Sequence, residues 1–269
     1  MRAVGILYGS RAVVLGSLEP LTYTATMQST RSMEYPFRRL ARTAKVHEVV
    51  LLGTREEADK ALKAVHALHR RAEGNLRQPA GVHPAGTPYS AFDQELMLWT
   101  LAVIVDSART MYETMVKPLT GSEREELWQD YVLFGELFGM SREAMPASYR
   151  EFDAWFTERL ASPAAGPTAH GLEMTPLVAF EQPVPLASQP IRHLNNLVIK
   201  GTLPPWVREA FGIRWTAFHE AAFRTVTASN RVVSRVLPRR LRRGRNDLVF
   251  DHLIRAEERR GGTDTPDLE

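Results

Sequence analysis

Residues 96–105 constrain the fold of this 269-residue chain more than any other stretch, because they are apolar on all faces of a helix. They lie inside a longer segment with helical character, about residues 91–117. A helix that is apolar all round is surrounded by other helices rather than lying on a surface. The run is too short for a membrane span, which needs roughly 20 residues. The sequence therefore predicts a central helix buried by its neighbours.

Helix starts are marked by a Ser or Thr that is followed three residues later by Glu. This pairing satisfies the free amide groups at the beginning of a helix. The three pairs are Thr54 with Glu57, Ser122 with Glu125, and Ser148 with Glu151. Further helices are predicted at 123–138, 149–161, 188–200, 204–211 and 215–236 from their periodicity.

The first predicted pair of helices is joined by a very short turn. Pro36 stands where a first-turn proline is tolerated and opens a helix that runs to about residue 52, and Gly53 ends it. The next helix covers about residues 55–73. Because short connections favour antiparallel neighbours, we expect the two helices to pack side by side.

Two segments are rich in Pro and Gly and are predicted as loops, residues 74–89 and 161–190. Within the second, residues 172–180 are apolar enough to dock on a core. No strand alternation is apparent. The sequence predicts an all-α, single-domain helical bundle over residues 1–260, with a disordered polar tail at 261–269.

Composition excludes several kinds of site. The chain has no cysteine, which rules out disulfides, thiolate zinc sites and iron–sulfur clusters, so any metal is held by His, carboxylate or Tyr. We find no phosphate-cradling glycine loop, no G-x-S-x-G motif and no H-E-x-x-H motif.

The net charge and the N-terminal residues indicate which partners and which cellular location to expect. The net charge is only +3, with much of the basic excess in residues 235–245, so no nucleic-acid partner is predicted. That stretch is either a solvated helix end or a weak contact with an acidic membrane surface. Residues 1–18 carry Arg11 in their middle and do not resemble a signal peptide, so we expect a cytoplasmic protein without a transmembrane segment. The oligomeric state is not predicted.

Histidines gather on the first helical pair. Arg39, Thr43 and His47 recur every four positions and share one helix face, while His66 and His69 share a face of the next helix. Either these are surface or half-buried side chains, or two packed helices aim them at one cavity.

Two carboxylates also attract attention. Asp106 directly follows the apolar run, and a carboxylate at the end of a buried segment needs a partner. We expect it to be hydrogen-bonded to a neighbouring arginine. Glu19 precedes Pro20 near an apolar stretch, where it is either a partly buried acid or a turn residue.

The order of short motifs along residues 8–240 resembles the family of latex-clearing rubber oxygenases and mpaB-type oxygenases. The matching pieces are Pro36-Phe37-Arg38-Arg39-Leu40-Ala41-Arg42-Thr43, Gly53-Thr54-x-Glu56-Glu57-Ala58, His69 before Gly74, Pro88-Tyr89-Ser90-Ala91-Phe92-Asp93, Leu98-Trp99 with Val105-Asp106-Ser107, and Leu203-Pro204-Pro205-Trp206-Val207.

This resemblance implies an all-helical fold that encloses a b-type haem. His69 matches the axial iron ligand, and Arg39 and Thr43 match an arginine and a threonine near the cofactor. The implied function is a haem-dependent oxygenase acting on a small hydrophobic or aromatic substrate, with oxygen or peroxide activated at the iron. The alternative is a helical protein that binds haem or a hydrophobic ligand without catalysis.

The sequence departs from the family pattern at two places. Members commonly carry His-Pro near the N-terminus and Trp-Val-His in the central helix, whereas this chain has Glu19-Pro20 and Trp99-Thr100-Leu101. Because Glu19 replaces that histidine, we hypothesise that it acts as an acid or base at the site.

Overall fold

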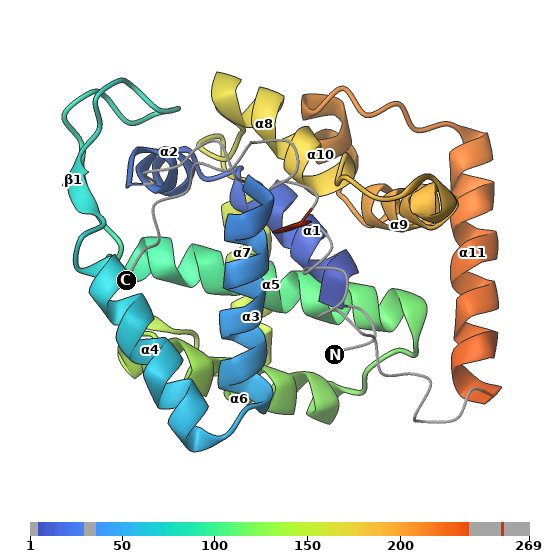
Figure 1. Cartoon of the computed structure of the whole chain (residues 1–269), viewed down its shortest axis with the longest axis horizontal. Helices are drawn as coiled ribbons and strands as arrows, with labels where there is room; N and C mark the ends of the chain where they lie inside the picture. The colour runs from blue at the N-terminus through green and yellow to red at the C-terminus, as the bar shows by residue number, and fades with distance from the viewer. Residues whose placement is uncertain (1–4, 30–35, 237–253, 256–269) are drawn as a thin grey trace.

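The computed structural model describes residues 5–29, 36–236 and 254–255. Helices dominate, as predicted, and strands are limited to one small hairpin (Figure 1). The elements are α1 (Gly5–Gly16), α2 (Pro20–Ser29), α3 (Pro36–Leu52), α4 (Arg55–His69), β1 (Glu73–Asn75), β2 (Pro88–Ser90), α5 (Gln94–Met115), α6 (Gly121–Leu137), α7 (Tyr149–Leu160), α8 (Ala169–Phe180), α9 (Gln189–Gly201), α10 (Pro205–Ala210) and α11 (Ala217–Val236), with short 3-10 turns at Arg142–Ala144 and Leu186–Ser188.

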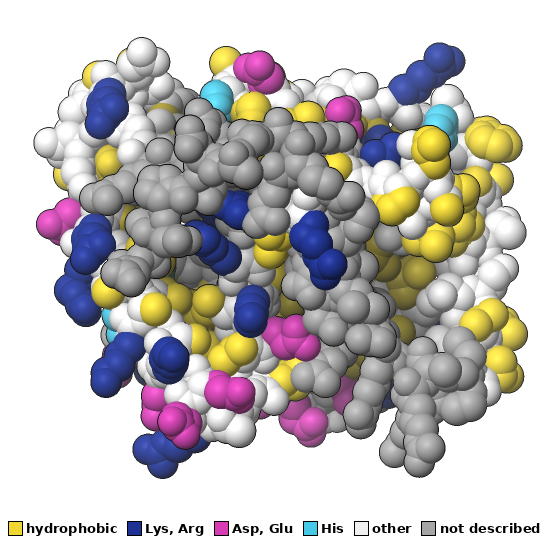
Figure 2. All heavy atoms as spheres, in the orientation of Figure 1, with side chains coloured by type: hydrophobic (Ala, Val, Ile, Leu, Met, Phe, Trp, Pro, Cys, Tyr) yellow, Lys and Arg dark blue, Asp and Glu magenta, His cyan; other side chains and the backbone are white. Residues whose placement is uncertain are grey.

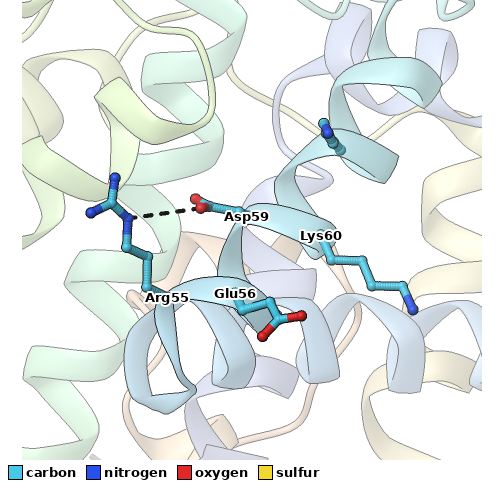
Figure 3. A pocket seen from close by; sticks show the side chains of 5 residues that line it. Arg55, Glu56, Asp59 and Lys60 are labelled. Atoms are coloured by element: carbon cyan, nitrogen blue, oxygen red, sulfur yellow. Dashed lines mark ion pairs between the residues drawn. The ribbon is translucent and has the colours of Figure 1, made fainter.

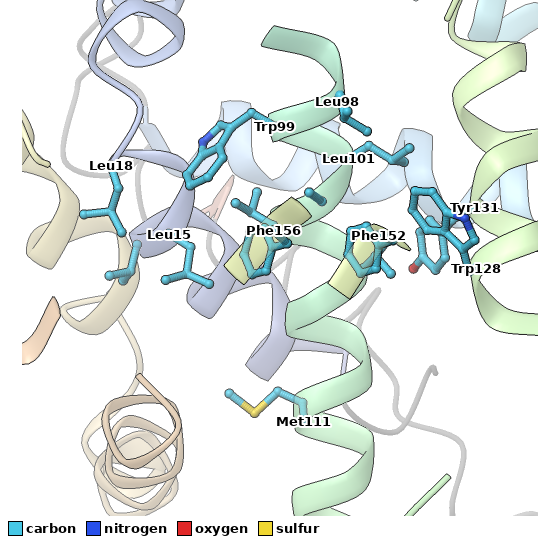
Figure 4. Packing of buried hydrophobic residues seen from close by; sticks show 14 of the residues in the cluster. Leu15, Leu18, Leu98, Trp99, Leu101, Met111, Trp128, Tyr131, Phe152 and Phe156 are labelled. Carbon is cyan, nitrogen blue, oxygen red and sulfur yellow. The ribbon is translucent and has the colours of Figure 1, made fainter. Parts of the chain in front are cut away.

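Helix α5 is the central element, which confirms the prediction from its apolar run. It crosses the middle of the molecule and packs against α1, α6, α7 and α11 (Figure 1). Figure 4 shows the resulting core, in which Trp99 of α5 lies near Leu15 of α1 and near Phe156 of α7, whose ring centroid is 5.8 Å away. Further along, Trp128 of α6 stacks on Phe152 with ring centroids 4.3 Å apart. Burial of these large side chains is the main force that holds the bundle together.

The free backbone amides and carbonyls at both ends of α5 form hydrogen bonds with side chains from outside the helix. At its start, the Asp93 carboxylate accepts hydrogen bonds from the amides of Glu95 and Leu96. At its end, Asn230 and Arg231 of α11 donate to the carbonyls of residues 113–115. Since the last carbonyls of a helix have no partner within it, α11 is fixed across the end of α5 by these bonds.

The predicted helix starts are confirmed at two of three places. Thr54 and Glu57 form the reciprocal pair at the start of α4, and Ser148 accepts from the amide of Glu151 at the start of α7. The prediction of Ser122 with Glu125 was wrong. There the pair is shifted by two residues to Thr120 and Glu123, because Glu123 also binds Lys117 and so anchors the turn before α6. Glu125 instead accepts from the amide of Tyr149.

Helices α3 and α4 pack against each other, as their short connection predicted. Gly53 makes the turn, since a Cβ atom there would lie 2.6 Å from the carbonyl oxygen of Val49. Helix α3 passes in front of α5 in Figure 1. The α3–α4 pair thus forms a hairpin that lies over the central bundle.

Two predicted loops contain regular structure. The sequence predicts a loop over residues 161–190, but residues 169–180 form α8, whose start is capped by the Thr168 hydroxyl even though Pro176 lies inside the helix. In the other loop, β1 and β2 pair antiparallel, with Gly74 opposite Tyr89. The turn beyond β1 rests on α2: Gly81, at φ +57°, is so close to Pro20 that no side chain fits there.

Parts of the surface are apolar. Exposed apolar side chains gather along the edge formed by α9 and α11, among them Ile191, Phe218 and Val232 (Figure 2). No helix within the described residues is both long and apolar enough to cross a membrane. Most of the basic stretch 235–245 and the predicted tail 261–269 lie outside the described residues.

Candidate functional site

A cavity of about 340 Å³ lies between α3 on one side and α1, α2, α5 and α8 on the other. Its lining is predominantly apolar, with Val13, Leu40, Val103, Ile104 and Val178 among the residues that contribute. A concave, mostly apolar pocket with a few polar groups is the usual form of a small-molecule site. Most faces of the central helix α5 therefore pack in the core, and one face lines this cavity.

The polar stripe predicted on α3 faces the cavity. Arg39, Thr43 and His47 all line it, as expected from their spacing of four residues. Burial lowers the pKa of Arg39, yet an arginine side chain stays positively charged at neutral pH. The stripe thus gives one wall of an apolar cavity a cation, a hydroxyl and an imidazole.

The imidazole of His47 is held in a defined orientation. Its Nδ1 lies 2.7 Å from the carbonyl oxygen of Thr43, and its ring stacks on Phe134 of α6 at a centroid distance of 5.2 Å. Burial lowers the pKa of His47, so the ring is neutral at pH 7. A neutral imidazole whose Nδ1 carries the proton keeps the lone pair on Nε2.

Helices α2 and α8 supply a second polar group near Arg39. The hydroxyl of Tyr23 lies 2.9 Å from Nδ1 of His170. Burial raises the pKa of Tyr23, although the Thr175 hydroxyl and the Arg39 cation oppose that rise. Tyr23 and Thr175 both line the cavity. Sequence reasoning missed these residues because the helices that carry them were not predicted.

His69 lies at the end of α4 and does not line this cavity. Its ring meets Phe92 edge-on at a centroid distance of 5.5 Å, and its Nδ1 is buried with no hydrogen-bond partner in the described structure. Burial lowers its pKa, and the neighbouring His66 adds to that effect. His69 therefore remains neutral at pH 7 with a buried ring nitrogen that lacks a partner.

The other histidine predicted on this face is engaged elsewhere. Nε2 of His66 lies 3.0 Å from the carbonyl oxygen of Leu137 at the end of α6. His66 therefore ties the α3–α4 hairpin to α6, and it does not line the cavity.

Glu19 is buried, with 3% of its surface exposed, at the junction of α1 and α2. One carboxylate oxygen accepts a hydrogen bond from Arg159 at 2.6 Å, and the other lies 3.6 Å from Nε2 of His83. Glu19 does not line the cavity. The structure thus places it apart from Arg39 and Thr43, in an ion-pair cluster that links α7 to the turn beyond β1.

Asp106 confirms the prediction that its carboxylate binds a neighbouring arginine. It pairs with Arg11 of α1 at 2.6 Å and with Arg109 at 2.5 Å. Burial alone raises the pKa of Asp106, but the two guanidinium groups outweigh that effect and hold it below its ordinary value. The predicted residue therefore has a structural role: it joins α1 to α5 behind the cavity.

A second hollow lies on the outer face of α4, with charged side chains as its lining (Figure 3). Arg55 and Asp59 form an ion pair of 3.9 Å there, and both side chains are exposed. Such a pair is screened by water and stabilises little. This hollow is a solvated helix face, and it lacks the apolar walls of the first cavity.

Comparison with known proteins identifies the chain at the level of a family. Residues 1–232 match the family described as ER-bound oxygenase mpaB/B'/Rubber oxygenase, catalytic domain. Neither the curated proteins nor the solved structures yielded a significant match. The matched range includes every helix that borders the cavity and the segment with His69. The chain therefore belongs to the mpaB and rubber oxygenase catalytic-domain family.

Proposed function

We propose that the protein is a haem-dependent oxygenase that acts on a small hydrophobic or aromatic substrate. The observation that carries the proposal is the apolar cavity with Arg39 and Thr43 on its wall, found in a chain of an oxygenase family. Apolar walls exclude water and bind an apolar substrate by burying its surface. The cavity volume of about 340 Å³ suits a small molecule.

Three residues carry groups that suit a b-type haem, two on the cavity wall and one, His69, outside the cavity lining. His69 offers a neutral imidazole with a buried, unpartnered ring nitrogen, which suits an iron ligand. Arg39 supplies a cation that pairs with a carboxylate such as a haem propionate. Thr43 adds a hydroxyl one helical turn away. The group itself supplies the activation of oxygen or peroxide, which protein side chains do not provide.

In this proposal the side chains of the protein bind and orient the substrate. The α1 and α5 wall holds the substrate by apolar contact, and α3 covers it with the side that bears Arg39. Because the cavity is closed off from bulk water on several sides, charges within it act more strongly than they do in solution.

The hypothesis that Glu19 acts as an acid or base remains a prediction. Its ion pair with Arg159 and its contact with His83 support a different role, in which Glu19 positions α2 and α7. The substitution Glu19→Gln separates the two roles. A catalytic Glu19 predicts lost turnover with unchanged stability, whereas a positioning Glu19 predicts a lower melting temperature.

The function is tested by producing the full chain with a haem precursor and recording its optical spectrum. We expect a Soret band for the wild type, its loss or shift in His69→Ala, and no change in His193→Ala, which removes an exposed histidine on α9. A colourless wild-type protein would overturn the haem proposal. Oxygen or peroxide consumption with apolar substrates then distinguishes an oxygenase from a protein that only binds haem.

A further inference from the structure

His47 is the one histidine among the described residues that line the cavity. It lies on the same face of α3 as Arg39 and Thr43, two helical turns beyond Arg39. Eight residues of α-helix span about 12 Å, so Arg39 and His47 can contact different parts of a ligand that lies along α3. His69, by contrast, reaches the protein interior beside Phe92 from α4.

The surroundings of His47 match those of metal-binding histidines. A carbonyl oxygen only accepts hydrogen bonds, so the 2.7 Å contact with Thr43 places the proton on Nδ1. Metal-binding histidines commonly donate their second ring N–H to a backbone carbonyl, which fixes the ring and makes the other nitrogen more basic. Nε2 of His47 makes no hydrogen bond to any described residue. Phe134 and Phe138 support the ring from α6.

The other polar groups of the cavity are less suited to bind iron. Burial raises the pKa of both Tyr8 and Tyr23, which disfavours the phenolate form that binds iron. The amide of Gln182 donates to the Ser10 hydroxyl at 3.0 Å. The guanidinium of Arg39 has no lone pair to offer. Nε2 of His47 is therefore the strongest metal-binding atom among the described cavity-lining residues.

We propose that His47 binds the iron of the haem group through Nε2, as a ligand supplied by the same helix that carries Arg39 and Thr43. This inference rests on the proposed function, because it requires that the cavity takes a haem. His47 lines the cavity and His69 does not, so variants of the two histidines are compared separately.

The experiment compares His47→Ala, His47→Gln, His69→Ala and His66→Ala in the haem-loaded full chain. His66→Ala is the matched control, since it removes a histidine of the same hairpin that is bonded to Leu137. Optical and electron paramagnetic resonance spectra report the ligands and spin state of the iron. Transfer of haem to apomyoglobin reports how fast the group is lost, and circular dichroism shows that each variant is folded.

We expect both His47 variants to change the spin state and to lose haem about tenfold faster or more. Free imidazole, which fits the space left in His47→Ala, should restore the wild-type spectrum. Wild-type spectra in both His47 variants, together with a lost or shifted Soret band in His69→Ala, would overturn the role of His47 and leave the proposed function standing. A change that free imidazole does not reverse would also count against ligation. A wild-type chain that binds no haem would overturn both proposals.

Discussion

The two walls of the cavity are built differently. The inner wall, from α1 and α5, belongs to the buried core and is tied together by the Arg11–Asp106 ion pair and by a hydrogen bond from Trp99 to the carbonyl of Gly16. The outer wall is α3, where only Phe37 and Ala41 are fully buried. The stability of the fold resides in the inner wall, while the groups suited to bind a cofactor lie on the outer one. Substitutions in the inner wall should therefore mainly lower the stability of the fold, whereas substitutions in the outer wall should mainly change ligand binding.

The largest effect is expected at Asp106. Asp106→Ala leaves the buried Arg11 cation without its carboxylate, and breaking a buried pair in this way costs about 3–5 kcal/mol of unfolding free energy. The matched control is Asp59→Ala, which removes an exposed pair on α4 and should cost less than about 1 kcal/mol. Urea unfolding measures both. Equal losses would mean that the inner wall is not the stable one.

Adding bulk to each wall gives the next largest contrast. Ala102→Phe overfills the packed inner wall, because Ala102 is buried in the core and does not line the cavity, and it should cost about 1–3 kcal/mol of unfolding free energy or more. Ala44→Phe on α3 fills the cavity from the other side and should change stability by less than about 1 kcal/mol, because the new ring enters empty space.

Ligand uptake completes that comparison. Titration with an apolar fluorescent dye should show weaker binding in Ala44→Phe than in the wild type, since its ring occupies the cavity. Undiminished dye binding in this variant would contradict the assignment of the cavity as the ligand site.

Acid should weaken the inner wall in particular. The pKa of Asp106 is lower in the folded protein than the value of about 3.9 in the unfolded chain. Its contribution to stability is therefore present above pH 3.9 or so and is lost as the pH falls through the folded pKa. Each unit of difference between the two pKa values is worth about 1.4 kcal/mol. The unfolding free energy of wild type, followed from pH 5 to pH 2, should fall more steeply than that of Asp106→Ala; parallel curves would exclude Asp106 as the cause.

The smallest effect concerns the turn of the α3–α4 hairpin. Thr54→Ala removes the hydroxyl that accepts a hydrogen bond from the amide of Glu57. Loss of such a helix cap lowers the unfolding free energy by about 1 kcal/mol. Hydrogen exchange should become faster in the first turn of α4 and stay unchanged in α5. If exchange in α5 rose equally, the hairpin would be part of the same cooperative unit as the inner wall.

Much of the fold follows from local sequence patterns. The apolar run 96–105 predicted the central helix, and Pro36 with Gly53 predicted the bounds of α3, because these signals act within a few residues. The start of α6 was misplaced because Thr120 and Ser122 each have a glutamate three residues on. The choice depends on Lys117, which binds Glu123 from outside the helix.

Helix α8 was missed for a related reason. Gly171 and Pro176 lower its intrinsic helix propensity, so the helix depends on packing against α1 rather than on local preference. Only its apolar character, which predicted that it would dock on the core, was visible in the sequence.

Part of the candidate site could also be predicted from local sequence patterns, and part could not. The stripe of Arg39, Thr43 and His47 follows from helical periodicity alone, and the structure brings all three to the cavity. Tyr23 and Thr175 come from helices far apart in the sequence, and their meeting depends on tertiary packing. The sequence left open whether His66 and His69 share a cavity with the stripe, and in the structure neither of them lines the cavity that His47 lines.

The long sequence separation across the inner wall has a consequence for how the molecule assembles. Arg11 and Asp106 are 95 positions apart, and α8 adds its side of the cavity only after residue 169. Contacts between distant residues form slowly because a long loop must close first, whereas the adjacent α3 and α4 can pair early. During synthesis the outer wall is therefore complete well before there is a cavity to cover. A ligand that requires the complete cavity can be bound only after α8 has been synthesised.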